Sequence, residues 1–139
     1  MKLYAMKVSS NDKICQKHFR MFQDDLKLSG KSYWTSDHSG SISVNDYLGF
    51  IESNENIQFY RITNIISKCD TLHKLIRENK EWKDTKFENR DIIELVPISH
   101  KIYFWNEWAL QIGYTLGKNK KVFTPRGIQY VKKAVSLPT

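Results

Sequence analysis

Two tryptophans, Trp34 and Trp82, have the side chains that recognition of a flat ligand requires. Trp34 lies in a short strand-like run, residues 32–37, that ends in small polar residues, and Trp82 lies in a polar stretch flanked by lysines. Two facing indoles hold a purine or pyrimidine between them, and stacking contributes about 1–3 kcal/mol per base. A methylated group against indole gains a further electrostatic term. The two residues predict the walls of a base-binding pocket; the alternative is that both are ordinary core tryptophans.

Small polar residues follow the first expected strand, residues 3–8, and supply hydrogen-bonding groups for such a pocket. They are helix-capping types: Ser9, Ser10, Asn11 and Asp12. Together with Thr35, which follows Trp34, they are candidates for contacts to a base edge, and a helix N-terminus beside them suits a phosphate. A protein that pulls one nucleotide out of its stack recovers the cost by stacking the base and bonding its edge.

The charge of the chain favours a polyanionic partner. The formal net charge is +7 over 139 residues. Nucleic acid fits better than a membrane, because no apolar run approaches the ~20 residues that span a bilayer. The candidate phosphate-binding residues are Lys7, Lys31, Arg90, Lys118, Lys120, Lys121 and Arg126. The predicted partner is RNA, or single-stranded or flipped-base DNA.

Motifs of catalysis and metal binding are not found in the sequence. It has no Gly-rich phosphate loop, nucleophile elbow or paired-histidine motif, and Cys15 and Cys69 lack the spacing of zinc ligands. The nearest approaches to catalytic pairs are Asp24-Asp25 and Asp37-His38. We therefore expect a binding protein without metal or cofactor. Two free thiols, and a charge at Lys7 where a signal peptide needs its apolar core, predict an intracellular protein.

Turn residues and alternation predict the strands of one α+β domain over residues 1–139. Strands are expected over residues 3–8, 33–35, 44–51, 57–66 and 90–96. The turn-like residues 52–56 predict that the third and fourth of these strands form a hairpin.

Apolar spacing and capping residues predict the helices. One helix has its apolar positions from Ile14 to Leu26 and ends at Ser29-Gly30, with His18 on its apolar stripe as a core histidine. A second begins at Asp70-Thr71 and uses Leu72, Leu75 and Ile76 as its apolar positions. Two more are expected, one over residues 105–112 and one from Thr124-Pro125 through Ile128 and Val131.

Several local strings resemble the YTH domain, a reader of N6-methylated adenosine in RNA, and its relative the EVE domain, both of the PUA-like superfold. Lys7 to Asp12 is similar to the strand-end Lys-Ser motif that precedes the first helix of the family. Tyr33 to Ser36 is similar to its Trp-Cys/Ser-Ser/Thr string. The segment that carries the second tryptophan also matches, through Trp82, Lys83, Phe87, Arg90, Ile92, Val96 and Pro97.

The resemblance implies a PUA-like curved mixed sheet or barrel flanked by helices, in which Trp34 and Trp82 are opposite walls of an aromatic cage. The sequence departs from the family at Lys13, near the position of an Asn or Asp that contacts adenine. A third cage wall is also not identified. The expected function is reading a modified base, N6-methyladenine first, in RNA. The alternatives are an ASCH-like hydrolase or ribonuclease that uses the same cleft, and a protein-interaction module anchored by the tryptophans.

Overall fold

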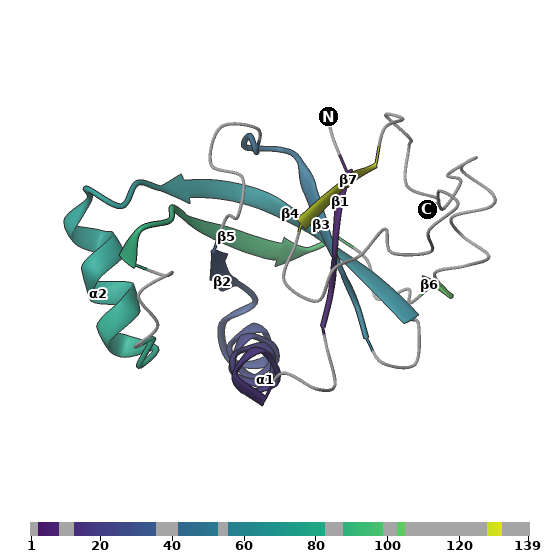
Figure 1. The fold of residues 1–139 in the computed structure, drawn as a ribbon, viewed down its shortest axis with the longest axis horizontal. Coiled ribbons are helices and arrows are strands. Elements are labelled where there is room, and N and C mark those ends of the chain that lie inside the picture. The colour runs from purple at the N-terminus through teal and green to yellow at the C-terminus, as the bar shows by residue number, and fades with distance from the viewer. Residues whose placement is uncertain are drawn as a thin grey trace.

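The computed structural model describes residues 3–8, 13–35, 42–52, 56–82, 88–98, 103–104 and 128–131, which form a curved sheet with two helices against it (Figure 1). The strands are β1 (Leu3–Lys7), β2 (Ser32–Thr35), β3 (Tyr47–Ile51), β4 (Asn56–Ile66), β5 (Ile92–Pro97), β6 (Tyr103–Phe104) and β7 (Ile128–Val131). The helices are α1 (Lys13–Ser29) and α2 (Thr71–Asn79). The predicted α+β fold, with a curved mixed sheet flanked by helices, is confirmed.

The sheet is mixed in direction. Its described strands run in the order β2-β5-β4-β3-β1-β7, and β6 pairs with β4. Only β1 and β3 are parallel among these pairs, with Leu3 opposite Tyr47 and Lys7 opposite Ile51. Parallel neighbours need a long crossover, and the chain that contains α1 and β2 supplies it. The predicted hairpin is present as β3 and β4, with Ile51 opposite Ile57.

The curvature centres on β4, the longest strand. Its first half pairs with β3 and its second half with β5. The register with β5 shifts between Ile62 and Asn64, which leaves Thr63 as an extra residue in β4. Such a bulge bends the strand and increases its twist. The Thr63 hydroxyl donates to Glu94 Oε1 at 2.9 Å and fixes the bulge to β5.

Helix α1 forms because its apolar residues recur at helical spacing, as predicted, and these residues cover one face of the sheet. His18, Phe19 and Phe22 are buried, and Leu26 packs against the same core. The helix ends where Gly30 takes a φ of +75° and donates its N–H to the Leu26 carbonyl at 2.9 Å. Glycine takes this left-handed conformation without steric cost.

Helix α2 begins at the predicted cap, but of its three expected apolar positions only Ile76 is buried. The Asp70 carboxylate accepts the Leu72 N–H at 2.9 Å. His73 and Ile76 point inward, whereas Leu72 and Leu75 are exposed. Hydrophobicity alone chose Leu72 and Leu75, and this prediction was wrong because a hydrogen-bonded histidine takes the buried position.

The expected C-terminal helix through Ile128 and Val131 is also wrong. These residues form β7, which pairs antiparallel with β1 through Leu3 opposite Val131 and Met6 opposite Ile128. Isoleucine and valine favour strands, and β1 offers an unpaired edge on the side away from β3. The expected helix over residues 105–112 lies outside the described residues. No helix in the described part of the chain is both long and apolar enough to cross a bilayer.

Candidate functional site

Trp34 is a core residue in the structure. Its side chain is 4% exposed, and its indole meets three phenylalanine rings edge-on. The ring centroids lie 6.5 Å from Phe19, 6.0 Å from Phe22 and 5.1 Å from Phe50. These edge-to-face contacts are among the favoured geometries of aromatic pairs. The indole therefore joins β2 to α1 and β3.

Trp82 is buried by the way in which α2 ends. Glu81 has a left-handed φ of +56°, its N–H donates to the Glu78 carbonyl, and the Trp82 N–H donates to the Arg77 carbonyl at 3.0 Å. This pair of bonds is a Schellman motif, in which the residue after the left-handed one packs on the last turn of the helix. Trp82 accordingly packs with Ile76 and is 6% exposed.

The two indoles belong to different clusters. Trp34 lies in the main core, and Trp82 lies in a second cluster with Ile66, Ile76 and Ile92. Tyr33 packs against this second cluster, and adjacent residues of a strand point to opposite faces, so Trp34 points away from it. The structure thus differs from the expected pair of half-exposed, facing indoles, because each indole is packed inside its own hydrophobic cluster.

The other predicted site residues are dispersed. Thr35 is buried at the end of β2, Lys31 pairs with Glu94 at 3.7 Å, and the Arg90 carbonyl contacts the His73 ring. Lys7 pairs through its backbone with Ile51 in β3. The remaining predicted residues lie outside the described part of the chain: Ser9, Ser10, Asn11, Asp12, Lys118, Lys120, Lys121 and Arg126.

His73 is a buried polar residue that the sequence analysis did not select. It is fully buried, and its Nε2 lies 2.6 Å from the Arg90 carbonyl oxygen. Arg77 Nε donates to His73 Nδ1 at 3.2 Å. An arginine N–H can only donate, so His73 Nδ1 is the acceptor. His73 Nε2 therefore carries the hydrogen and donates it to the Arg90 carbonyl oxygen. Both ring nitrogens are satisfied, which gives His73 a structural role between α2 and the chain before β5.

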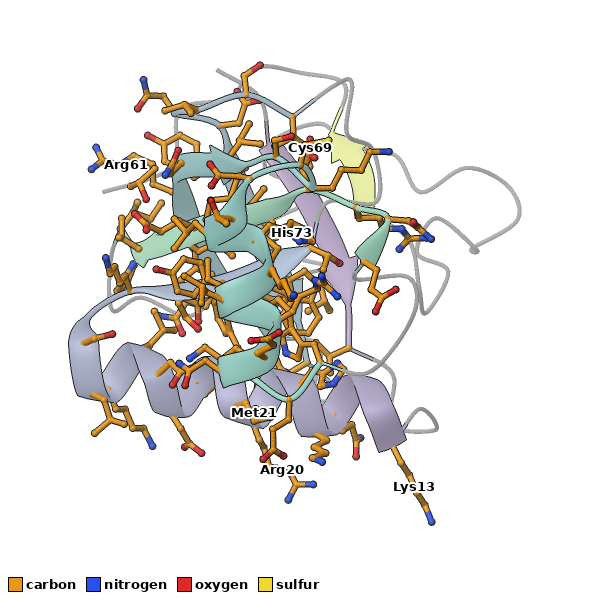
Figure 2. All side chains as sticks on the ribbon, turned by 90° about the vertical axis from the view of Figure 1, so that its left-hand side faces the viewer. Lys13, Arg20, Met21, Arg61, Cys69 and His73 are labelled. Atoms are coloured by element: carbon orange, nitrogen blue, oxygen red, sulfur yellow. The ribbon has the colours of Figure 1, made fainter. Side chains whose placement is uncertain are left out.

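A set of cations on α1 was missed as well. Lys13, Lys17, Arg20 and Lys27 are all exposed and follow each other at spacings of three, four or seven residues, which places them on one side of a helix. Figure 2 shows Lys13 and Arg20 extending from α1 away from the sheet. Within the described residues none of the four forms an ion pair, unlike Lys31, Lys74, Arg77 and Lys80. The spacing was visible in the sequence.

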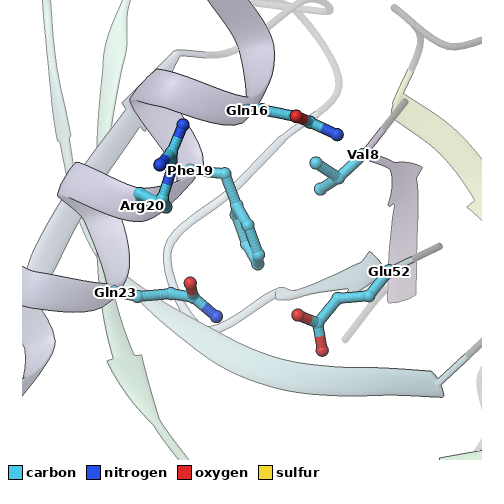
Figure 3. Close-up of a pocket in the computed structure, with 6 residues that line it drawn as sticks. All are labelled: Val8, Gln16, Phe19, Arg20, Gln23 and Glu52. Carbon is cyan, nitrogen blue, oxygen red and sulfur yellow. The ribbon is translucent and has the colours of Figure 1, made fainter. Parts of the chain in front are cut away.

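Beside this set lies a pocket of about 220 Å³ between the end of β1, residues 16–23 of α1 and the end of β3 (Figure 3). It is lined by Val8, Gln16, Phe19, Arg20, Gln23 and Glu52. Its backbone frame is fixed, because Val8 donates to the Ile51 carbonyl and Glu52 to the Asn56 carbonyl, both at 2.9 Å.

The pocket combines an apolar floor with polar side chains that are free to bond a ligand. Phe19 and Val8 are apolar and buried. Gln16, Arg20, Gln23 and Glu52 form no hydrogen bond or ion pair through their side chains with another described residue. Burial and the negative charge of Glu52 raise the pKa of Tyr60 to about 12.

Among the residues that the structure describes, no group of three or more His, Cys, Asp or Glu is placed to hold a metal ion. Of the acidic pair in α1, Asp24 is exposed and Asp25 pairs with Lys80. Asp37 and His38 lie outside the described residues.

No protein-family model, curated protein or solved structure matches this chain. The resemblance to YTH and EVE domains therefore remains a prediction from short local strings. The proposed function depends on the geometry of the site.

Proposed function

We propose that this chain is a nucleic-acid-binding domain that holds a strand along the exposed face of α1. The observation that carries the proposal is the set of cations without ion-pair partners in the described structure: Lys13, Lys17, Arg20 and Lys27. A rise of about 1.5 Å per residue places Lys13 and Lys27 about 21 Å apart along the helix axis. The exposed Asp24 lies in the same stripe between Arg20 and Lys27, so the row keeps a net excess of cations, which suits a linear polyanion with regularly spaced phosphates.

The packing of α1 favours nucleic acid over a lipid surface. A helix that binds a membrane inserts its apolar face among the acyl chains. Among the described side chains of α1, Phe19 and Phe22 are buried against the sheet and Leu26 packs there too, whereas Leu28 is exposed. One exposed leucine does not make an apolar face that could insert into a membrane.

The finer part of the proposal is that the bound strand is RNA with a modified base, N6-methyladenine first. This part is supported by the resemblance to the YTH domain. Since Trp34 and Trp82 are packed in separate cores, the proposal does not require them to contact the base directly.

The experiment is a salt titration with matched charge variants. Lys17→Gln/Lys27→Gln removes two charges from α1 but leaves the pocket intact, and Lys68→Gln/Lys74→Gln removes two exposed charges elsewhere. Glutamine and lysine have similar helix propensities. Each lost phosphate contact is expected to reduce the log–log salt slope for a single-stranded 12-mer RNA by about 0.7, so the α1 variant loses about 1.4 and the control variant keeps its slope.

Equal slopes for the two variants, or an affinity that does not change with salt, would reject α1 as the binding face. The same titration with a single N6-methyladenine, and with the matching DNA, tests the finer part. Labelled oligonucleotides that are cleaved over hours would support the ASCH-like hydrolase or ribonuclease instead. Salt-independent binding of another protein would support the interaction module.

A further inference from the structure

We infer that the pocket at Phe19 takes one unstacked base that carries an exocyclic amino group, with Glu52 as the group that disfavours uracil. The inference rests on the proposed function, because it places the base of the same strand that α1 holds. It assigns the specificity of the domain to the pocket residues and not to the two tryptophans.

The size of the pocket fits a single ring system. Its volume of about 220 Å³ lies below the ~300–1,000 Å³ of pockets for drug-sized ligands. A pocket of this size suits one flat base. Phe19 and Val8 line its floor but are each 6% exposed, so they offer only a small apolar contact to a base and the polar side chains around them supply most of the binding.

The pocket lies next to the exposed cations of α1. This arrangement suits a nucleic-acid strand that turns one base inward. Gln16, Arg20, Gln23 and Lys27 follow each other at intervals of four, three and four residues, which is one stripe along the helix. Arg20 belongs both to the pocket rim and to the exposed cations. Phosphates bound by the cations would therefore pass the mouth of the pocket.

The polar side chains determine which base edge is accepted. Gln16 and Gln23 each offer a donor and an acceptor, whereas the Glu52 carboxylate only accepts when ionised. Figure 3 shows the carboxylate of Glu52 extending into the space between β3 and Gln23 on α1. The amino groups of adenine and cytosine donate to such a carboxylate. Uracil has no amino group and offers on that edge only its N3–H, flanked by two carbonyl oxygens that repel the carboxylate, so it fits this acceptor less well.

The test uses an oligo-U 9-mer RNA whose central base is adenine, cytosine or uracil. The wild-type protein is expected to bind the adenine and cytosine forms about tenfold more tightly than the all-uracil form, within the range that one contact to a base edge provides. Glu52→Gln, which can also donate, is expected to bring this ratio close to one. Glu78→Gln, an exposed carboxylate on α2 with the same change in charge, is expected to keep it.

A second variant separates the pocket from the stability of the fold. Gln23→Ala is expected to weaken binding of the adenine form without a change in melting temperature, because Gln23 lies at the partly exposed edge of α1. A wild-type ratio of one with salt-dependent binding would overturn the pocket and leave the proposed function standing. A ratio that survives Glu52→Gln would overturn the role of Glu52. Absence of binding to all three RNAs would overturn both proposals.

Discussion

Replacing Trp34 with alanine distinguishes a core indole from a pocket wall, and the structure specifies the outcome. The side chain is 4% exposed and contacts three phenylalanine rings, so its removal leaves a cavity between α1, β2 and β3. Truncating a buried tryptophan to alanine lowers the free energy of unfolding by about 3–5 kcal/mol. A domain is stabilised by only about 5–15 kcal/mol in total, so this loss is a large fraction.

The expected change in melting temperature follows from the size of the chain. The entropy of unfolding is about 2.1 cal/mol/K per residue, or about 0.29 kcal/mol/K for 139 residues. Trp34→Ala should therefore lower the melting temperature by about 10–17 °C. Trp34→Phe keeps an aromatic ring in the cluster and should lose roughly half as much or less.

The assay measures melting temperature and oligonucleotide affinity on the same preparations, at a temperature where Trp34→Ala remains folded. We expect the large fall in stability, with the ratio of affinities for methylated and unmethylated RNA unchanged in Trp34→Phe. A Trp34→Ala protein that melts within about 2 °C of wild type but loses affinity would refute the core assignment. It would restore the indole as a wall of the binding pocket.

Three further changes test separate features of the fold. Glu81→Gly should raise the free energy of unfolding by about 0.5–1 kcal/mol in chemical denaturation, because glycine accepts the φ of +56° without strain. Gly49→Ala should lower it by about 1–3 kcal/mol, since the new Cβ would lie 2.6 Å from Ile57 Cδ1 in a fully buried site; an unchanged midpoint would show that this contact relaxes. Burial holds the pKa of Tyr60 at about 12, above the unfolded value of 10.0, so the unfolded state releases this proton first and stability should fall as pH rises from 10 to 12. Tyr60→Phe should reduce that slope, and identical slopes in the two proteins would contradict the assignment.

The parts of the fold that could be predicted from the sequence are those with local causes. Helix α1 follows from apolar spacing and from Gly30 at its end, and the start of α2 follows from the Asp70 cap. The β3–β4 hairpin follows from turn residues between two strand-like runs. Each signal lies within a few residues of the element that it determines.

The errors came from contacts between distant residues. Thr124-Pro125 has the pattern of a helix start, yet residues 128–131 pair with β1 at the other end of the sequence. The polar neighbours of Trp82 suggested exposure, but Lys80 pairs with Asp25 of α1 and the left-handed Glu81 turns the indole inward. Neither β1, the partner of residues 128–131, nor Asp25, the partner of Lys80, can be identified from the residues next to them in the sequence.

The pocket in the structure consists of other residues than the site expected from the sequence. The expected site paired Trp34 and Trp82 with the polar residues 9–12, which lie outside the described residues, whereas the pocket is lined by Phe19 and the α1 glutamines. The tryptophans were selected because two facing indoles can hold a base, but large aromatic rings are also commonly buried in cores.

The pairing of β1 with β7 has a consequence for biosynthesis. Leu3 and Val131 are neighbours in the sheet, so one side of β1 has no strand beside it until nearly the whole described chain has been translated. The β3–β4 and β4–β5 pairs join segments that are close in sequence. They can form on the ribosome before β7 has been synthesised to pair with β1. Pairings between such distant residues form slowly because loop closure precedes the contacts that stabilise them. A nascent chain of this protein therefore exposes the outer edge of β1 for longer than any other described pairing partner, and chaperones that shield extended segments would act at this edge.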